Sequence, residues 1–192
     1  MTKTSLQADY FDALYEINGD PWNFKSSPYE AEKYAATLAA LPRLQYGSGI
    51  EVGCSIGVLT RMLAARCSQM LGVDVSKTAI LAAEEYCADV NNVTFKTSRF
   101  PSDIPDEKSD LIVLSEVLYY FDNDELALAA HAVREISMPD ADVVCVHWLG
   151  PTPDYPMTGD EAVEAFINAI GPMKVISQAR SRDYRLDLLR LV

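Results

Sequence analysis

The segment from Ile50 to Gly57, IEVGCSIG, constrains the fold of this chain more than any other. An apolar run ends there on an acidic residue, Glu51, and on two glycines that lie four positions apart, Gly53 and Gly57. Glycine allows positive φ and a close approach of the backbone to a small molecule, and the first N–H groups of a following helix remain unpaired. The segment therefore predicts a strand-to-helix turn that binds a ligand.

The next strand-like segment, residues 70–75, also ends on an acidic residue. Its Asp74 lies 23 positions after Glu51. In nucleotide-binding α/β units, a carboxylate at this place accepts hydrogen bonds from ribose hydroxyls. The nicotinamide fingerprint GxGxxG fails, because Ser55 replaces its second glycine and Val58 falls at its third. The spacing therefore disfavours a dinucleotide.

A glycine pair followed by this acid resembles the S-adenosylmethionine site of class I methyltransferases, which usually has a middle glycine where this chain has Ser55. A narrower resemblance, to the nodulation protein S family, rests on DPW at 20–22, SPYE at 27–30, EVGC at 51–54 and SEVLYY at 115–120. Known members of that family methylate an amino-sugar nitrogen. The resemblance implies a class I methyltransferase that uses S-adenosylmethionine, releases S-adenosylhomocysteine and N-methylates a small molecule or amino-sugar.

From about residue 48 the chain alternates strand-like and helix-like segments, which predicts a parallel sheet covered on both faces. The strands are expected at about 48–54, 70–75, 93–96, 110–116, 142–148, 174–180 and 184–191. Only three residues separate the last two, too few for a crossover, so these must pair antiparallel. We therefore expect an α/β, Rossmann-like fold with a seven-stranded, mostly parallel sheet, an antiparallel last strand and helices on both faces.

An aromatic N-terminal segment, residues 1–41, is expected to form a helical cap over a methyltransferase core of residues 42–192, within a single domain. Ser27 and Glu30 form a capping box that starts the cap helix, and Pro42 ends it. Further helices are expected over 57–67, from Ser76 to Cys87, from Asp122 or Asn123 onward, and from Asp160 to Gly171.

Composition excludes several classes of function. The net charge of −12, without a Lys/Arg cluster, would repel a phosphate backbone, so we expect no nucleic-acid partner. The four cysteines lack CxxC spacing and the two histidines complete no ligand pattern, so we expect reduced thiols and no metal. Without a leader or a long apolar stretch, the expected location is cytoplasmic and away from membranes. The oligomeric state is left open.

The expected cofactor residues lie where strands end, because ligands of open α/β sheets bind there. Asp74 is expected on the ribose and Val75 against the adenine, while Ser98 and Phe100 could meet the purine unless they form a surface turn. On the cap helix, Lys33 would meet the methionine carboxylate, or remain solvated. The full set is Tyr29, which would cover the sulfonium, Lys33, Glu51, Gly53, Cys54, Gly57, Asp74, Val75, Ser98, Phe100 and Ser115.

Glu116 is the leading catalytic candidate, since it follows four apolar residues and Ser115 at the end of a buried strand. Its carboxylate, like the aromatic faces of Tyr119 and Tyr120, would attract a sulfonium or a protonated amine. His147, at the end of the strand 142–148, is either a second candidate base or a structural histidine. An amine acceptor needs a group that takes its proton, and the sequence does not choose among Glu116, His147 and a tyrosine.

Two other classes of function remain as alternatives. The segment from Gly53 to Gly57 also spells GxSxG, so Ser55 could be the nucleophile of a small α/β-hydrolase with Asp110 and His147. Against this, the elbow follows the first strand and no HGGG-type oxyanion loop precedes it. The chain could also bind the cofactor without catalysis and act as an interaction domain.

Overall fold

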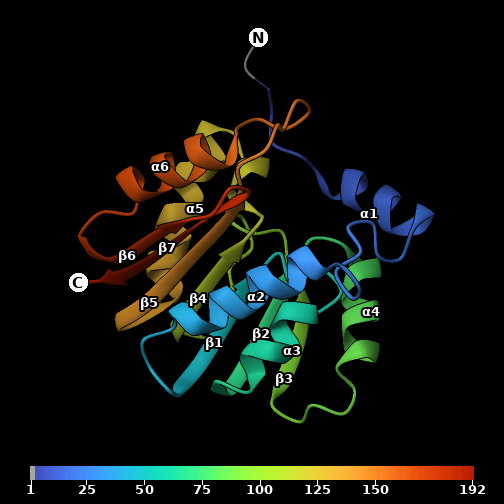
Figure 1. Cartoon of the computed structure of the whole chain (residues 1–192), viewed down its shortest axis with the longest axis horizontal. Helices are drawn as coiled ribbons and strands as arrows, with labels where there is room; N and C mark the ends of the chain where they lie inside the picture. The colour runs from blue at the N-terminus through green and yellow to red at the C-terminus, as the bar shows by residue number, and fades with distance from the viewer. Residues whose placement is uncertain (1–2) are drawn as a thin grey trace.

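The computed structural model describes residues 3–192, and its strands form one sheet (Figure 1). The strands are β1 (Tyr46–Val52), β2 (Cys67–Asp74), β3 (Val93–Thr97), β4 (Ser109–Ser115), β5 (Ser137–Trp148), β6 (Met173–Arg180) and β7 (Tyr184–Leu191). Their order in the sheet is β3-β2-β1-β4-β5-β7-β6. Strands β1 to β5 pair in parallel, whereas β7 is antiparallel to both β5 and β6. The predicted α/β fold is therefore confirmed.

The helices are α1 (Ala8–Ile17), α2 (Pro28–Ala40), α3 (Val58–Ala64), α4 (Lys77–Tyr86), α5 (Asn123–Ile136) and α6 (Gly159–Ala169), with a short 3₁₀ helix η1 (Leu118–Tyr120). The predicted caps Ser27, Ser76 and Asp122 each accept a backbone N–H. The prediction for α6 is wrong by two residues: its cap is Thr158, which forms a capping box with Glu161. The sequence from Thr158 to Glu161 has the T-x-x-E pattern of a capping box, but the prediction placed the helix cap at Asp160.

Alternate residues of the central strands face two separate apolar clusters, as a sheet covered on both faces requires. On β4, Ile112 and Leu114 pack with α5 and α6, while Leu111 and Val113 pack with α2 and α3. Figure 1 shows α2 and α3 on one side of the sheet and α5 with α6 on the other. The sheet is thereby held rigidly between two helical layers.

The two N-terminal helices differ in their packing. Tyr34 of α2 and the following Leu41 lie in the same buried cluster as α3, so α2 helps to cover the sheet. Tyr15 of α1 is buried with Ile56, and Trp22 packs against that pair from the connecting segment. The division into a cap of residues 1–41 and a core of 42–192 stays a prediction. No helix between residues 3 and 192 has the length and hydropathy needed to span a bilayer.

Several strands begin earlier than expected, and backbone pairing explains why. Tyr46 pairs with Cys67, which extends β1 by two residues and β2 by three beyond the apolar runs that predicted them. Ser137 pairs with Ser109 across an irregularity in the register, so β5 starts five residues before the predicted 142. Ladder hydrogen bonds involve backbone atoms, so these polar ends carry no hydropathy signal.

Candidate active site

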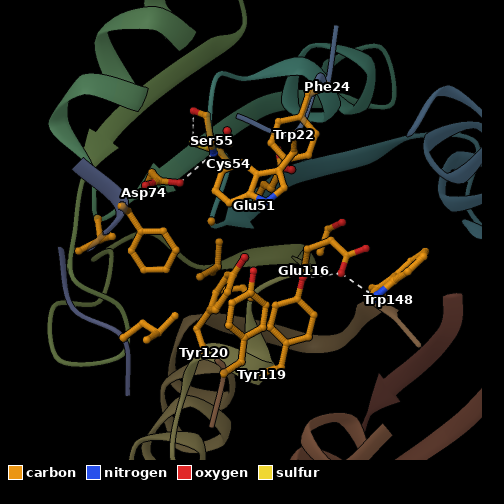
Figure 2. Close-up of a pocket in the computed structure, with 18 of the residues that line it drawn as sticks. Trp22, Phe24, Glu51, Cys54, Ser55, Asp74, Glu116, Tyr119, Tyr120 and Trp148 are labelled. Carbon is orange, nitrogen blue, oxygen red and sulfur yellow. Dashed lines mark hydrogen bonds between the residues drawn. The ribbon is translucent and has the colours of Figure 1, made fainter. Parts of the chain in front are cut away.

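A cavity of about 410 Å³ opens at the carboxyl ends of β1, β2, β4 and β5, with the segment from α1 to α2 along its opposite wall. Figure 2 shows carboxylates and aromatic rings converging on it from several elements. Most of the predicted site residues line this cavity, namely Tyr29, Lys33, Glu51, Gly53, Cys54, Asp74, Val75, Ser98, Phe100, Ser115, Glu116, Tyr119 and Tyr120. Gly57 and His147 are not among the residues that line it.

The turn after β1 contains three residues with positive φ: Gly53 at 73°, Ser55 at 50° and Gly57 at 79°. A Cβ on Gly53 would lie 3.3 Å from Val117, so this position keeps the turn close to the next strand end. Gly57 has another role, because a Cβ there would lie 3.1 Å from both Ala83 and the ring of Phe95. The structure therefore gives Gly57 a role in tight packing behind the cavity, and its contact with a cofactor stays a prediction.

Asp74 organises the same turn from the end of β2. Its Oδ2 accepts a hydrogen bond from the backbone N–H of Ser55 at 2.8 Å, and its Oδ1 accepts from that of Ser76 at 2.9 Å. The hydroxyls of Ser55 and Tyr15 lie 2.5 Å apart, so α1 is joined to the turn. Asp74 thus has the structural role of a helix-cap neighbour, and it also faces the cavity where a ribose hydroxyl could reach its remaining lone pairs.

Glu51 and Asp74 are buried carboxylates whose hydrogen-bond partners are neutral. Glu51 is 2% exposed and accepts from the hydroxyl of Thr60 at 2.5 Å. Burial raises its pKa to about 8 and raises the pKa of Asp74 to about 6. Within residues 3–192, no Lys or Arg side chain forms an ion pair with either carboxylate. A ligand with a cationic group and hydroxyls would satisfy both.

Glu116 lies at the centre of the cavity wall with φ at +57°. Its Oε2 accepts from the hydroxyl of Tyr119 at 2.8 Å and from the backbone N–H of Trp148 at 2.9 Å (Figure 2). Its Oε1 lies 2.5 Å from Nζ of Lys33, which also pairs with Glu30 at 3.1 Å. Lys33 is only 1% exposed, so the alternative of a solvated lysine is wrong. Its contact with a methionine carboxylate stays a prediction.

The part of the cavity that follows β3 contains Ser98 and Phe100, which are 3% and 7% exposed. These values exclude the alternative of a surface turn for both residues. The Ser98 hydroxyl donates to the Asp103 carbonyl at 2.6 Å, so it offers a purine only its lone pairs. Phe100 packs near Phe121, with ring centroids 6.5 Å apart. Its contact with a bound purine stays a prediction.

Aromatic rings cover the side of the cavity next to Glu116. Tyr119 stacks on Tyr155 at 5.2 Å, and Tyr120 meets Tyr155 edge to face at 4.8 Å. Burial raises the pKa of the Tyr119 and Tyr120 hydroxyls far above the usual value, so both remain protonated at neutral pH. The Tyr119 hydroxyl therefore donates to Glu116, and the rings of both tyrosines form apolar walls, while the choice of a proton acceptor stays a prediction.

His147 is fully buried in β5 and does not line the cavity. Its Nε2 accepts hydrogen bonds from the backbone N–H groups of Val117 at 3.3 Å and Leu118 at 3.0 Å. Burial lowers the pKa of the imidazole to about 4. The arrangement corrects the expectation of a second candidate base, because the nitrogen that would take a proton is already occupied by two donors.

The hydrolase alternative fails on geometry. Ser55 follows the carboxyl end of β1, whereas Asp110 lies at the amino end of β4 and accepts from the N–H groups of Gly47 and Ser48. Because β1 and β4 are parallel, these two groups lie at opposite ends of the sheet. The third member, His147, faces the turn at Val117. The three side chains therefore form no triad.

Sequence reasoning missed the site role of Trp148. Its backbone N–H holds Glu116, and its ring meets Tyr29 edge to face at 5.6 Å. Tyr10 and Leu6 also line the cavity from the N-terminal segment. The position of Trp148 at the carboxyl end of a predicted strand was a usable signal, because ligands of open α/β sheets bind at such ends.

Comparison with known proteins places the chain in a family. Residues 12–148, more than two thirds of the chain, match the family of nodulation protein S (NodS). This chain belongs to the nodulation protein S family. It is 32% identical over 139 residues to nodulation protein S of Bradyrhizobium diazoefficiens and 29% identical over 127 residues to that of Rhizobium tropici. These matches cover 67% and 65% of this chain.

The chain spans 66% of the Bradyrhizobium diazoefficiens relative and 53% of the Rhizobium tropici relative, less than two thirds of either. The fold agrees with a crystal structure of the N-methyltransferase NodS from Bradyrhizobium japonicum in complex with S-adenosyl-L-homocysteine. That similarity has a TM-score of 0.81 at 20% identity and covers 96% of this chain and 97% of the other. The nodulation protein S family member described here therefore has the class I methyltransferase fold.

Proposed function

We propose that this chain is an S-adenosylmethionine-dependent methyltransferase that methylates the nitrogen of a small-molecule amine. The observation that carries the proposal is the pair of buried carboxylates, Glu51 and Asp74, which flank a turn with positive φ and lack a cationic partner among the described residues. The methionine portion of S-adenosylmethionine carries an ammonium group, and its ribose carries two hydroxyls. Family membership and a relative crystallised with S-adenosylhomocysteine support the same cofactor.

When bound, S-adenosylmethionine supplies a methyl group on a positively charged sulfur, so the protein has mainly to align the reactants and exclude water. In this chain Asp74 would hold the ribose, and Phe100 would cover the purine. Tyr119, Tyr120 and Tyr155 would exclude water from the reacting side. Glu116 would attract the protonated amine and accept its proton.

The charge of the lining supports an amine and disfavours an acidic acceptor. Carboxylates of Glu30, Glu116, Glu125 and Asp154 line the cavity in addition to those assigned to the cofactor. Both cations of the described lining are paired: Lys33 with Glu30 and Glu116, and Arg99 with Glu125. An acceptor phosphate or carboxylate would meet no free cation there. An amino-sugar, the acceptor expected from the family resemblance, fits this lining.

The expected cytoplasmic location, the exclusion of nucleic acid as a partner and the oligomeric state remain separate predictions. All four cysteines are buried thiols without a disulfide, and burial raises the pKa of each. This state is compatible with a reducing compartment.

The test combines binding and transfer. S-adenosylhomocysteine should raise the melting temperature, and radiolabelled S-adenosylmethionine should label an amine from a panel of amino-sugars and small amines. Glu116→Gln keeps the shape but loses the charge, so transfer should fall by roughly 10²-fold or more. Glu135→Gln, on the exposed side of α5, is the matched control and should have normal activity.

Each outcome separates two possibilities. No thermal shift at millimolar S-adenosylhomocysteine would overturn the cofactor assignment. Binding without transfer to any amine would favour the non-catalytic interaction domain. Normal transfer in Glu116→Gln would remove Glu116 from the reaction and leave catalysis to alignment.

A further inference from the structure

The end of β5 holds the turn after β4 through consecutive residues. The carbonyl of Val146 accepts from the N–H of Glu116 at 2.8 Å, and the N–H of Trp148 donates to the Glu116 carboxylate at 2.9 Å. Between these two contacts, Nε2 of His147 accepts from the N–H groups of Val117 and Leu118. Residues 146–148 thus bind both the backbone and the side chain of residues 116–118.

This turn needs such support. Glu116 has φ at +57°, a left-handed conformation that is unfavourable for a residue with a Cβ. Val117, the N-cap of η1, and Leu118, its first residue, are 8% and 0% exposed, so water cannot satisfy their N–H groups. A buried donor without a partner is costly. His147 is the acceptor for both donors, and it therefore permits the conformation that presents Glu116 to the cavity.

The geometry determines which ring nitrogen carries the proton. A nitrogen that accepts from two N–H groups must have its lone pair free, so Nε2 is unprotonated. The neutral ring then carries its proton on Nδ1, which is buried without a hydrogen-bond partner among the described residues. An imidazolium would point a third N–H at two N–H donors and break the contact.

We propose that His147, as its neutral Nδ1–H tautomer, is a positioning residue that fixes the turn 116–118 and so orients the Glu116 carboxylate toward the acceptor amine. This inference rests on the proposed methyltransferase function. The ring itself would touch no reactant, because it does not line the cavity and meets Tyr119 edge to face, with 5.4 Å between the centroids.

The charges around the ring come from three directions. Glu116 in the turn and Asp187 on β7 favour the imidazolium, whereas Lys33 on α2 and Arg185 on β7 disfavour it. These opposed influences leave burial as the largest cause of the shift to a pKa of about 4. The ring should therefore remain neutral between pH 6 and pH 8, the range in which transfer would be measured.

The experiment compares two substitutions with different hydrogen-bonding capacity. In His147→Gln the side-chain amide oxygen reaches about as far as Nε2 and can accept the same two bonds, whereas His147→Leu fills the space without an acceptor. We expect His147→Gln to retain kcat within about tenfold and His147→Leu to lose roughly 10²-fold, with similar affinity for S-adenosylhomocysteine in both. His131→Gln, at an exposed histidine of α5, is the matched control.

NMR of the wild-type protein labelled with ¹⁵N-histidine tests the tautomer without any activity. We expect a neutral Nδ1–H ring at pH 7 and slow amide exchange at Val117 and Leu118. Exchange at these two amides should accelerate in His147→Leu and remain slow in His147→Gln. These readouts stay valid if methyl transfer is never detected, so failure of the inference and of the proposed function are distinguishable.

Two results would overturn the inference. One is an Nε2–H tautomer or an imidazolium in the wild-type protein at pH 7. The other is a His147→Gln variant that binds S-adenosylhomocysteine normally but is as inactive as His147→Leu, because this would give the imidazole a direct role with the reactants. If His147→Leu does not fold, the wild-type spectrum and His147→Gln still decide between these outcomes.

Discussion

Two sets of buried carboxylates, at opposite ends of the sheet, have partners of opposite kinds. Near the amino end of β4, the fully buried Asp142 of β5 pairs with Arg190 at 2.7 Å and with Arg43 at 3.3 Å. At the carboxyl ends, Glu51 and Asp74 accept hydrogen bonds only from neutral donors. Compensated charges support the fold, whereas uncompensated ones raise the pKa and leave binding capacity for a ligand. The difference indicates which end was built for function.

The largest effect is expected where the charges are compensated. Asp142→Ala would leave two arginines and the Tyr46 hydroxyl without their buried acceptor. The free energy of unfolding should fall by roughly 3–5 kcal/mol, the scale of breaking a buried ion pair by removing one partner. Urea denaturation measures the loss. The folded fraction of the variant should bind S-adenosylhomocysteine normally. Weakened binding by this fraction would contradict the assignment of Asp142 to the fold alone.

The second prediction is a substitution that increases the free energy of unfolding. Because burial raises the pKa of Glu51 from its usual 4.5 to about 8, the folded protein favours the protonated acid, and the stability that this provides is lost as pH rises from 4.5 through 8. Glu51→Gln cannot ionise and keeps an oxygen for Thr60. The variant should exceed the wild type by roughly 2–4 kcal/mol at pH 9 and by little at pH 5.

Urea denaturation at several pH values tests this prediction, together with the affinity for S-adenosylhomocysteine, which should fall in Glu51→Gln. A stability difference that does not change with pH would show that Glu51 has the same pKa in the folded and unfolded protein, so that its burial does not disfavour the charged form. In that case the ionised Glu51 carboxylate would not destabilise the folded protein.

The smallest effect compares the same substitution at both ends. Asp74→Asn removes the charge that faces the ribose site, so affinity for S-adenosylhomocysteine should weaken by roughly 1–2 kcal/mol in calorimetry. Asp110→Asn removes a charge that accepts from Gly47, Ser48 and Arg43 at the other end, and should change stability but not affinity. Equal losses of affinity in the two variants would contradict the assignment of Asp74 to ligand binding and of Asp110 to stability.

Much of the fold was predictable because its signals are local. Alternation of apolar segments identified every strand, and the side chains of Ser27, Ser76 and Asp122 identified three helix starts. The beginning of β2 was not predictable, since Ser68 and Gln69 are exposed polar residues that belong to the strand only through backbone pairing. Such pairing leaves no trace in side-chain identity.

The site residues differ in the same way: those with a local side-chain signal were predictable, and those that depend on distant contacts were not. Glu51, Asp74 and Glu116 were predictable because an acid at the end of an apolar run is visible in the sequence, and all three line the cavity. The partners of His147 were not, because they are backbone N–H groups about thirty positions away. Spacing placed Gly57 with the ligand, yet packing against Phe95 and Ala83 requires that glycine. Spacing reports where a residue is in the chain and not what fills the space beside it.

The position of β7 between β5 and β6 has a consequence for the order in which the sheet can assemble during synthesis. A ribosome delivers β6 before β7, yet β6 pairs with no other strand of the sheet, so it must wait as a solvated segment until its neighbour emerges. The pairing of His147 with Arg185 waits for the same event. The nascent chain can therefore form β1 to β4 early, but β5, which holds the turn 116–118, gains its second neighbouring strand only when β7 has been released.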